Sequence, residues 1–211
     1  MKEYKLPIGC DVPETIILAD GDFPSHPLAL EWLRQCPYVV CCDGAANTYI
    51  CSGRMPEAIV GDGDSLLPDI KERYASLIHS EAEQETNDLS KAFRFCLSQE
   101  RRRITIMGAT GKREDHTIGN VSLLADYMEQ AEVSMMTDYG IFVPIREDSM
   151  FESYIGQQIS VFNMNSTALS AEGLAYPLSV FTNWWQGTLN EALARHFIIR
   201  TEGKVLVFRV F

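Results

Sequence analysis

Residues 58–65 read Ala58-Ile59-Val60-Gly61-Asp62-Gly63-Asp64-Ser65, a short apolar run that ends in two carboxylates one residue apart. We expect the apolar run to be a buried strand. The two carboxylates then lie at its carboxyl end, which is where ligands bind in an open α/β sheet. Paired acids at that edge suit a hard cation such as Mg²⁺, and the flanking glycines let the backbone turn sharply. A tight surface turn has the same composition, so the pair alone leaves both interpretations open.

The segments around this stretch alternate between short apolar runs and helical patterns. Before residue 137 we expect buried strands at residues 15–19, 38–42, 58–60, 104–107 and 133–136. The clearest helices cover residues 89–97 and about 117–128, because apolar residues recur there on one helical face. This alternation predicts an α/β fold whose mostly parallel sheet is covered on both faces.

From about residue 141 the pattern changes to strands without convincing helices. We expect these strands at residues 150–155, 158–162, 179–181, 196–199 and 204–210. Short strands bounded by turn residues are typical of an antiparallel β domain. The chain is therefore predicted to form an α/β domain over residues 1–140 and a small antiparallel β domain over residues 141–211.

Composition limits the class of protein. The chain has 211 residues, 46% hydrophobic content and a net charge of −11. An acidic chain disfavours nucleic-acid binding, which needs a basic surface. No run reaches the roughly 18 apolar residues of a membrane span, and the first residues lack the apolar stretch of a signal peptide. We therefore expect a cytoplasmic protein with neither a nucleic-acid nor a membrane partner, and with reduced cysteines.

Two further acids fall where the same sheet edge is predicted. Asp43 follows the strand that ends at Cys42, so it should emerge beside Asp62 and Asp64. Asp88 stands at the expected N-cap of the helix over residues 89–97, where a capping role and a metal role both fit. Lys91 lies on the same side of the first helical turn and could reach a phosphate or be merely solvated.

A basic loop with two glycines joins a predicted strand to a helix: Gly108-Ala109-Thr110-Gly111-Lys112-Arg113-Glu114-Asp115-His116. Its glycine spacing does not match the P-loop pattern. Backbone N–H groups, a helix start and two basic side chains nonetheless suit a phosphate, whereas a basic surface loop is the simpler alternative. His116 could bond a nucleotide or cap the helix. The other histidines, at positions 26, 79 and 196, lack ligand spacing and are interpreted as structural.

The order of these motifs resembles the thiamine pyrophosphokinase family. The resemblance runs through D-G-A-A-N at residues 43–47, G-D-G-D-S at 61–65, Q-E-T-N-D-L-S-K-A at 84–92 and G-A-T-G-K-R-E-D-H-T-I-G-N at 108–120. It continues through G-L-A-Y-P-L at 173–178 and N-E at 190–191. The ordered set is specific and implies an N-terminal Rossmann-like α/β/α domain, a C-terminal antiparallel β-sandwich, and a homodimer with active sites at the subunit interface.

The resemblance also implies an activity and its residues. Members of that family transfer the diphosphoryl group of ATP to the hydroxyethyl group of thiamine, giving thiamine diphosphate and AMP. By similarity, the catalytic acids that hold Mg²⁺ are Asp43, Asp62, Asp64 and Asp88. The residues that orient ATP would be Lys91, Gly108, Gly111, Arg113, Asp115 and His116. Thiamine, a flat cation suited to an aromatic wall, would be bound by Tyr176, Asn190 and Glu191.

Three positions depart from the family's usual motifs. Gly63 stands in place of a phenylalanine, Lys112 in place of a glycine, and Leu189 in place of a serine. The tryptophans at positions 184 and 185 are expected in the core, the commoner place for this residue type. Two other functions stay open: a Mg²⁺-dependent phosphohydrolase, for which an aromatic wall has no evident use, and a nonenzymatic nucleotide or thiamine sensor, which need not keep a full acid cluster.

Overall fold

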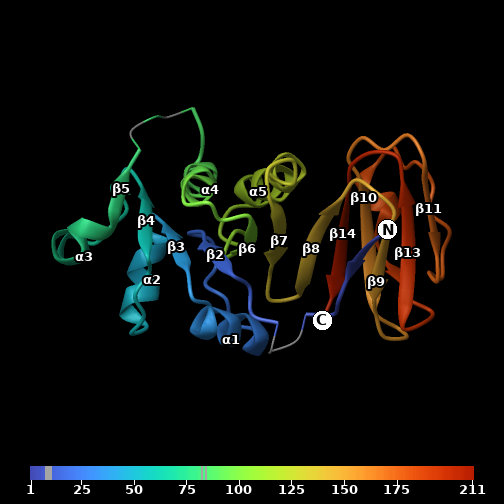
Figure 1. Ribbon diagram of the computed structural model, residues 1–211, viewed down its shortest axis with the longest axis horizontal. Helices are drawn as coiled ribbons and strands as arrows, with labels where there is room; N and C mark the ends of the chain where they lie inside the picture. The colour runs from blue at the N-terminus through green and yellow to red at the C-terminus, as the bar shows by residue number, and fades with distance from the viewer. Residues whose placement is uncertain (8–10, 82, 84) are drawn as a thin grey trace.

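The computed structural model describes residues 1–7, 11–81, 83 and 85–211. Gln84 of the Q-E-T-N-D-L-S-K-A motif and Cys10 lie outside these ranges. A ten-stranded sheet runs through the molecule in the order β12-β10-β14-β8-β7-β6-β2-β3-β4-β5 (Figure 1). Within the described ranges, no helix is long and apolar enough to cross a membrane.

The strands from β7 to β5 along this sheet are parallel. Their bounds are β2 Thr15–Leu18, β3 Val39–Cys42, β4 Ala58–Gly61, β5 Ile78–Ser80, β6 Arg103–Met107 and β7 Glu132–Met136. The expected strands agree with these to within a residue or two at each end. The expected helices correspond to α4 Asp88–Ser98 and α5 Glu114–Tyr127. The predicted parallel α/β architecture is therefore confirmed.

Helices cover both faces of the parallel part, as Figure 1 shows for α4 and α5 on one face and α1 on the other. The remaining helices are α1 Pro27–Gln35, α2 Ala45–Cys51 and α3 Pro68–Arg73. Successive strand residues point to opposite faces, so Cys42 packs in the core under α4 and α5, whereas Cys41 packs under α1 and α2. These two apolar layers hold the carboxyl ends of β2, β3, β4 and β6 in one row.

The rest of the chain forms a β-sandwich, which we call the second lobe; the parallel part with its helices is the first lobe. One layer is β8 Gly140–Ile145, β14 Val205–Val210, β10 Gln158–Asn163 and β12 Asn190–Glu191, all within the large sheet. The other layer contains β1 Lys2–Tyr4, β9 Ser149–Glu152, β13 His196–Thr201 and β11 Leu169–Glu172. A third apolar core lies between the layers, with Phe151 and Val207 contributed from opposite sides.

The structure adds two features to the predicted organisation. β1 pairs in parallel with β9, so residues 2–4 belong to the second lobe although they begin the chain. β8 begins at the expected domain boundary and pairs antiparallel with β7, so one sheet passes through both lobes. The expected strand at residues 179–181 is wrong: this stretch has no strand, and Leu178 and Phe181 pack on the core from an irregular segment.

Candidate active site

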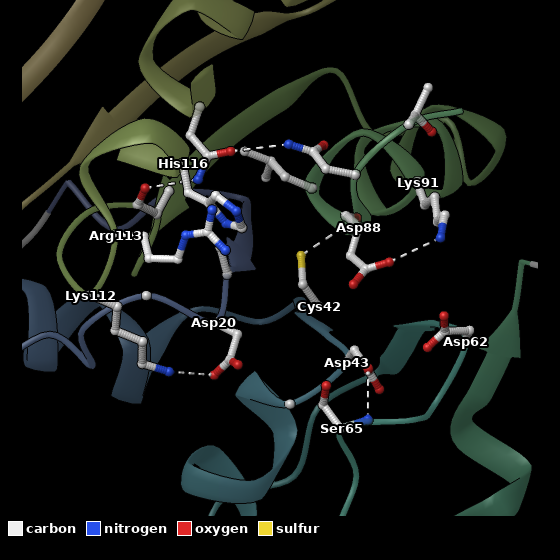
Figure 2. A pocket seen from close by; sticks show the side chains of 18 of the residues that line it. Asp20, Cys42, Asp43, Asp62, Ser65, Asp88, Lys91, Lys112, Arg113 and His116 are labelled. Atoms are coloured by element: carbon white, nitrogen blue, oxygen red, sulfur yellow. Dashed lines mark hydrogen bonds and ion pairs between the residues drawn. The ribbon is translucent and has the colours of Figure 1, made fainter. Parts of the chain in front are cut away.

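A cavity of about 470 Å³ opens at the carboxyl ends of β2, β3, β4 and β6, beside the first turns of α4 and α5 (Figure 2). Strand ends and helix starts meet here because every parallel strand delivers its following loop to the same edge of the sheet. The charged and amide side chains that line the cavity are those of Asp20, Asp43, Asp62, Asp64, Asn87, Asp88, Lys91, Lys112, Arg113, His116 and Asn120.

Three of the predicted acids form a cluster. Carboxylate oxygens of Asp43, Asp62 and Asp64 lie within 4.8 Å of one another. Asp43 is buried, and its Oδ2 accepts a hydrogen bond from the Ser65 N–H at 3.2 Å. Its Oδ1 is also buried and has no hydrogen-bond partner among the described residues. A buried carboxylate oxygen without a partner is costly, and a cation would satisfy it.

The electrostatics of the cluster also favour a cation. Burial raises the pKa of Asp43, and the neighbouring carboxylates of Asp88 and Asp62 raise it further. An all-oxygen donor set that opens onto a cavity is the kind of site that Mg²⁺ prefers, because this ion keeps waters and substrate oxygens in its shell. The residues present therefore fit a magnesium ion.

The backbone is shaped to bring these acids together. Asp43 has a positive φ of 33°, which is uncommon for a residue with a side chain. A Cβ on Gly61 would lie only 2.8 Å from the Cβ of Asp43. Glycine at position 61 thus permits the ends of β3 and β4 to approach.

A side chain that the sequence reasoning left without a role fixes the acidic loop. Asn47 of α2 donates from Nδ2 to the Ser65 carbonyl at 2.8 Å, and its Oδ1 accepts from the Leu67 N–H at 3.0 Å. Within the loop, Oδ1 of Asp62 accepts from the Asp64 N–H at 3.1 Å. Asn47 belongs to the D-G-A-A-N motif, so the signal for it was present in the sequence.

The fourth acid, Asp88, has a different environment. The N-cap of α4 is Asn87, whose Oδ1 accepts from the Ser90 N–H at 2.9 Å, so the expectation that Asp88 caps this helix is wrong. Asp88 occupies the first helical position and lines the cavity. Its Oδ1 lies 3.1 Å from Nζ of Lys91, a lysine that is only 3% exposed. This pair places a buried positive charge beside the acid cluster, where anionic phosphates could reach it.

The basic loop contributes Gly111, Lys112, Arg113 and His116 to the cavity. His116 lies in the first turn of α5 and does not cap it, because the N-cap position is Arg113. Asp115 lies outside the cavity lining and pairs with Arg113 at 2.6 Å.

Gly108 also lies outside the lining, and the structure shows a packing constraint at this position. A Cβ at this position would stand 2.7 Å from the Ala19 carbonyl oxygen. Glycine is therefore needed there for the loop to pack against residues 19–22. The Gly21 N–H donates to the Gly108 carbonyl at 2.6 Å and holds the two segments together.

Sequence reasoning missed Asp20 and the amides of Asn87 and Asn120. Asp20 lies two residues after the end of β2, so the rule that located Asp43 and Asp62 at strand ends also applies to it. Nδ2 of Asn87 donates to Oδ1 of Asn120 at 3.1 Å, and Nδ2 of Asn120 donates to the Ala109 carbonyl at 2.9 Å. These two hydrogen bonds tie the N-cap of α4 to the second turn of α5, and that turn to the loop after β6.

The residues expected to bind thiamine lie in the second lobe. Tyr176, Asn190 and Glu191 are not among the described residues that line the cavity. Asn190 is buried and holds the Tyr176 backbone, accepting from its N–H at 3.0 Å and donating to its carbonyl at 2.8 Å. The Tyr176 residue is 64% exposed. Within this one chain, the residues expected to bind thiamine therefore do not line the cavity that contains the acid cluster.

The expectation that both tryptophans pack in the core is wrong. Trp184 and Trp185 are 43% and 73% exposed. They belong to a short 3₁₀ helix, η2 Trp184–Gly187, and Trp184 contacts Phe162 edge-on at a ring-centroid distance of 6.1 Å.

Comparisons with known proteins agree with the fold and the motifs. The chain matches the family model "thiamin pyrophosphokinase, catalytic domain" over residues 29–136 and "thiamin pyrophosphokinase, substrate-binding domain" over residues 140–208. It is similar to thiamine pyrophosphokinase 1 of Oryza sativa subsp. japonica, with 32% identity over 98 residues, 42% of this chain and 37% of that protein. The thiamine pyrophosphokinase of Bacillus subtilis (strain 168) is 34% identical over 86 residues, 39% of this chain and 40% of that protein.

Both matches span less than half of the relative's length. Among solved structures, the thiamin pyrophosphokinase from Candida albicans superposes with a TM-score of 0.81 at 18% identity, covering 100% of this chain and 93% of that one. The thiamine pyrophosphokinase structure from Bacillus subtilis gives a TM-score of 0.77 at 20% identity, covering 93% and 98%. At such identities these superpositions show the fold alone. The catalytic-domain model matches more than half of the sequence, and the chain thus belongs to the thiamin pyrophosphokinase family.

Proposed function

We propose that this protein is a thiamine diphosphokinase that uses ATP. The hydroxyl oxygen of thiamine attacks the β-phosphorus, the bond between that phosphorus and the α–β bridging oxygen breaks, and AMP leaves. The observation that carries this proposal is the cluster of Asp43, Asp62 and Asp64, with its unpartnered buried oxygen, facing basic side chains across one cavity. Phosphoryl transfer depends mainly on positioning and on neutralising charge, and this arrangement supplies both.

The site residues have distinct tasks in this mechanism. Asp43, Asp62 and Asp64 would hold Mg²⁺, which supplies charge neutralisation on the transferring group. Lys91 and Arg113 orient phosphate oxygens, and each is already aligned by a carboxylate, Asp88 or Asp115. Asp64, an exposed member of the cluster, is a suitable acceptor for the hydroxyl proton, and Asp88 is the alternative.

The proposed assembly is a homodimer with sites shared between subunits. The acid cluster and the basic loop belong to the first lobe, whereas Tyr176, Asn190 and Glu191 belong to the second. A two-fold arrangement that places the second lobe of one protomer over the cavity of its partner would complete the site. The exposed ring of Tyr176 would then form one wall for the thiamine cation. A cytoplasmic location, where ATP is available, is part of this proposal.

The reaction is tested by incubating the purified protein with ATP, Mg²⁺ and thiamine. We expect AMP and thiamine diphosphate in equal amounts, measured by chromatography. Production of ADP with thiamine monophosphate would overturn the proposal. Release of inorganic phosphate without thiamine would indicate a phosphohydrolase, and binding without turnover would indicate a sensor.

A variant pair tests the acid cluster. Asp64→Asn should abolish turnover while leaving the unfolding midpoint unchanged, because Asp64 is exposed and carries a ligand oxygen. Asp69→Asn is the matched control, since Asp69 is an exposed acid in α3, just after the same loop. It should retain full activity. Near-normal turnover by Asp64→Asn would remove this residue from the metal site.

A further inference from the structure

The basic groups of the cavity are each paired with an aspartate, but the pairs differ in kind. Lys91 pairs with Asp88, and Arg113 pairs with Asp115, over sequence separations of three and two residues. Lys112 instead reaches Asp20, a residue 92 positions away in the loop after β2, with Nζ and Oδ1 at 3.0 Å (Figure 2). This pair therefore joins two separate loops at the cavity.

The Lys112–Asp20 pair is easily broken. The two side chains are 54% and 48% exposed, and exposed ion pairs contribute little to stability because water screens them and both side chains lose freedom. Lys91, by contrast, is buried and would lose its packing if it moved. A nucleoside triphosphate carries more negative charge than one carboxylate, so it can compete for the Lys112 ammonium group.

Although the Asp20 side chain is half exposed, one of its carboxylate oxygens lies against the start of α2. A Cβ on Gly44 would lie 2.8 Å from Oδ2 of Asp20, so this carboxylate lies directly over the Gly44 backbone. The long, flexible stem of Lys112 carries its ammonium group across to it. Lys112 can therefore exchange the Asp20 carboxylate for a phosphate group by moving its own side chain, while Asp20 stays in place.

We propose that Lys112 contacts the phosphates of a bound nucleoside triphosphate, and that Asp20 holds Lys112 in the nucleotide-free protein and competes with the phosphates for it. This inference rests on the proposed function, because it assigns the nucleotide to the same cavity. Lys112 is then a specificity residue for the polyphosphate group, and Asp20 is a positioning residue that weakens binding. The chain thus gains a positively charged hydrogen-bond donor to phosphate at a position where its family usually has a glycine.

The test is the binding of α,β-methylene-ATP with Mg²⁺ to the full chain, measured by calorimetry without thiamine. Lys112→Met keeps the side-chain stem and should weaken binding about tenfold, equivalent to about 1.4 kcal/mol. Lys112→Arg should restore most of the affinity. Asp20→Asn should strengthen binding several-fold. In the Lys112→Met background the Asp20→Asn gain should shrink, because the two substitutions are coupled through one contact.

A remote ion pair provides the controls. Lys204 lies 2.9 Å from Glu129, outside the cavity lining, so Lys204→Met and Glu129→Gln change net charge by the same amounts. Both should bind the analogue like the unmodified protein. Equal affinities for Lys112→Met and Lys204→Met would overturn the inference, as would weaker binding by Asp20→Asn.

The two proposals fail in different ways. If the unmodified protein binds the analogue and forms no thiamine diphosphate, the proposed activity fails while the role of Lys112 is still measured. If it forms thiamine diphosphate but binds the analogue equally well after Lys112→Met, only the role of Lys112 fails.

Discussion

The main-chain N–H of Ser65 donates to Oδ2 of Asp43 at 3.2 Å, which joins the loop after β4 to the acid at the end of β3. The two segments are 22 residues apart in sequence. This bond orients the Asp43 carboxylate and uses one of its oxygens. The other oxygen is buried without a hydrogen-bond partner among the described residues, so it is available to the proposed metal ion. The geometry of the acid cluster thus depends on the loop at residues 62–65 as much as on the acids themselves.

Asn47 is expected to control metal affinity without touching the metal. Asn47→Leu removes the donor to the Ser65 carbonyl and the acceptor for the Leu67 N–H. The loss should lower the free energy of unfolding by about 1–2 kcal/mol, and a looser loop should bind Mn²⁺ about tenfold more weakly. Manganese titration by electron paramagnetic resonance measures the affinity, and urea unfolding measures the stability.

Ser52→Ala is the control for that variant. Ser52 follows the same helix, and its hydroxyl donates to the nearby Tyr49 carbonyl at 2.6 Å and accepts from Nη1 of Arg54 at 2.9 Å, away from the acidic loop. We expect Mn²⁺ affinity to be unchanged in Ser52→Ala. If Asn47→Leu also binds Mn²⁺ normally, the loop does not need this clamp.

Metal binding should stabilise the folded protein through Asp43. With free Mg²⁺ at about 100 times its dissociation constant, the free energy of unfolding should rise by about 2.7 kcal/mol. Asp43→Asn removes the buried ligand oxygen, so the same Mg²⁺ concentration should produce a much smaller gain. Urea unfolding with Mg²⁺ or with a chelator measures both. An equal gain in both proteins would place the metal elsewhere.

The strand-end acids show what the sequence could predict. Asp43 and Asp62 were found because parallel strands deliver their carboxyl ends to one edge, a rule that needs only the order of apolar runs. The cap of α4 was misplaced by one residue, because Asn87 and Asp88 are both favoured N-cap types and only the fold selects between them. The pairing of β1 with β9 joins residues 147 positions apart, and no local pattern specifies it.

Gly63 shows why a departure from a family motif was hard to interpret. Its φ of 75° lies in the left-handed region, and its carbonyl accepts from Nζ of Lys71 at 2.7 Å. A phenylalanine would be strained in this conformation. The left-handed backbone at Gly63, which favours glycine at this position, is visible only in the structure.

Asp138 should make stability depend on pH in the acid range. Its carboxylate accepts from the Ser25 N–H at 2.8 Å, the Ser25 hydroxyl at 2.5 Å and the His26 N–H at 2.9 Å, which fixes the start of α1 to the turn before β8. Burial raises the pKa of Asp138, but these hydrogen bonds outweigh burial and lower it overall. Because its pKa is lower in the folded protein, ionised Asp138 stabilises the fold at pH values above the unfolded-state pKa of about 3.9. This stabilisation is lost as the pH falls through the folded-state pKa.

Asp138→Asn should therefore lower the free energy of unfolding by about 1–2 kcal/mol at pH 7. Below about pH 4 the difference in this free energy between the variant and the unmodified protein should narrow. Urea unfolding at a series of pH values measures this. Asp126→Asn, at an exposed position in α5, should follow the unmodified protein throughout. A difference for Asp138→Asn that stays constant down to pH 3 would show that its ionisation is not linked to folding.

The proposed sharing of active sites between two subunits makes a prediction about mixed dimers. Asp64→Asn damages the first lobe and Tyr176→Ala the second, so we expect each variant to have little activity alone. In a mixed dimer, one site carries both substitutions and the other carries neither. Random mixing by co-refolding should make about half of the dimers mixed, which restores about a quarter of the unmodified activity.

The control for this experiment mixes Asp64→Asn with Asp43→Asn. Both substitutions lie in the same acid cluster, so every site of their mixed dimer takes a damaged first lobe and no activity should return. If each protomer instead built a complete site alone, the Asp64→Asn and Tyr176→Ala mixture would also stay inactive, because every protomer would carry a defect. In that case the two lobes of one chain would have to close so that Tyr176 reaches the cavity. The amount of activity regained on mixing therefore decides between the two arrangements.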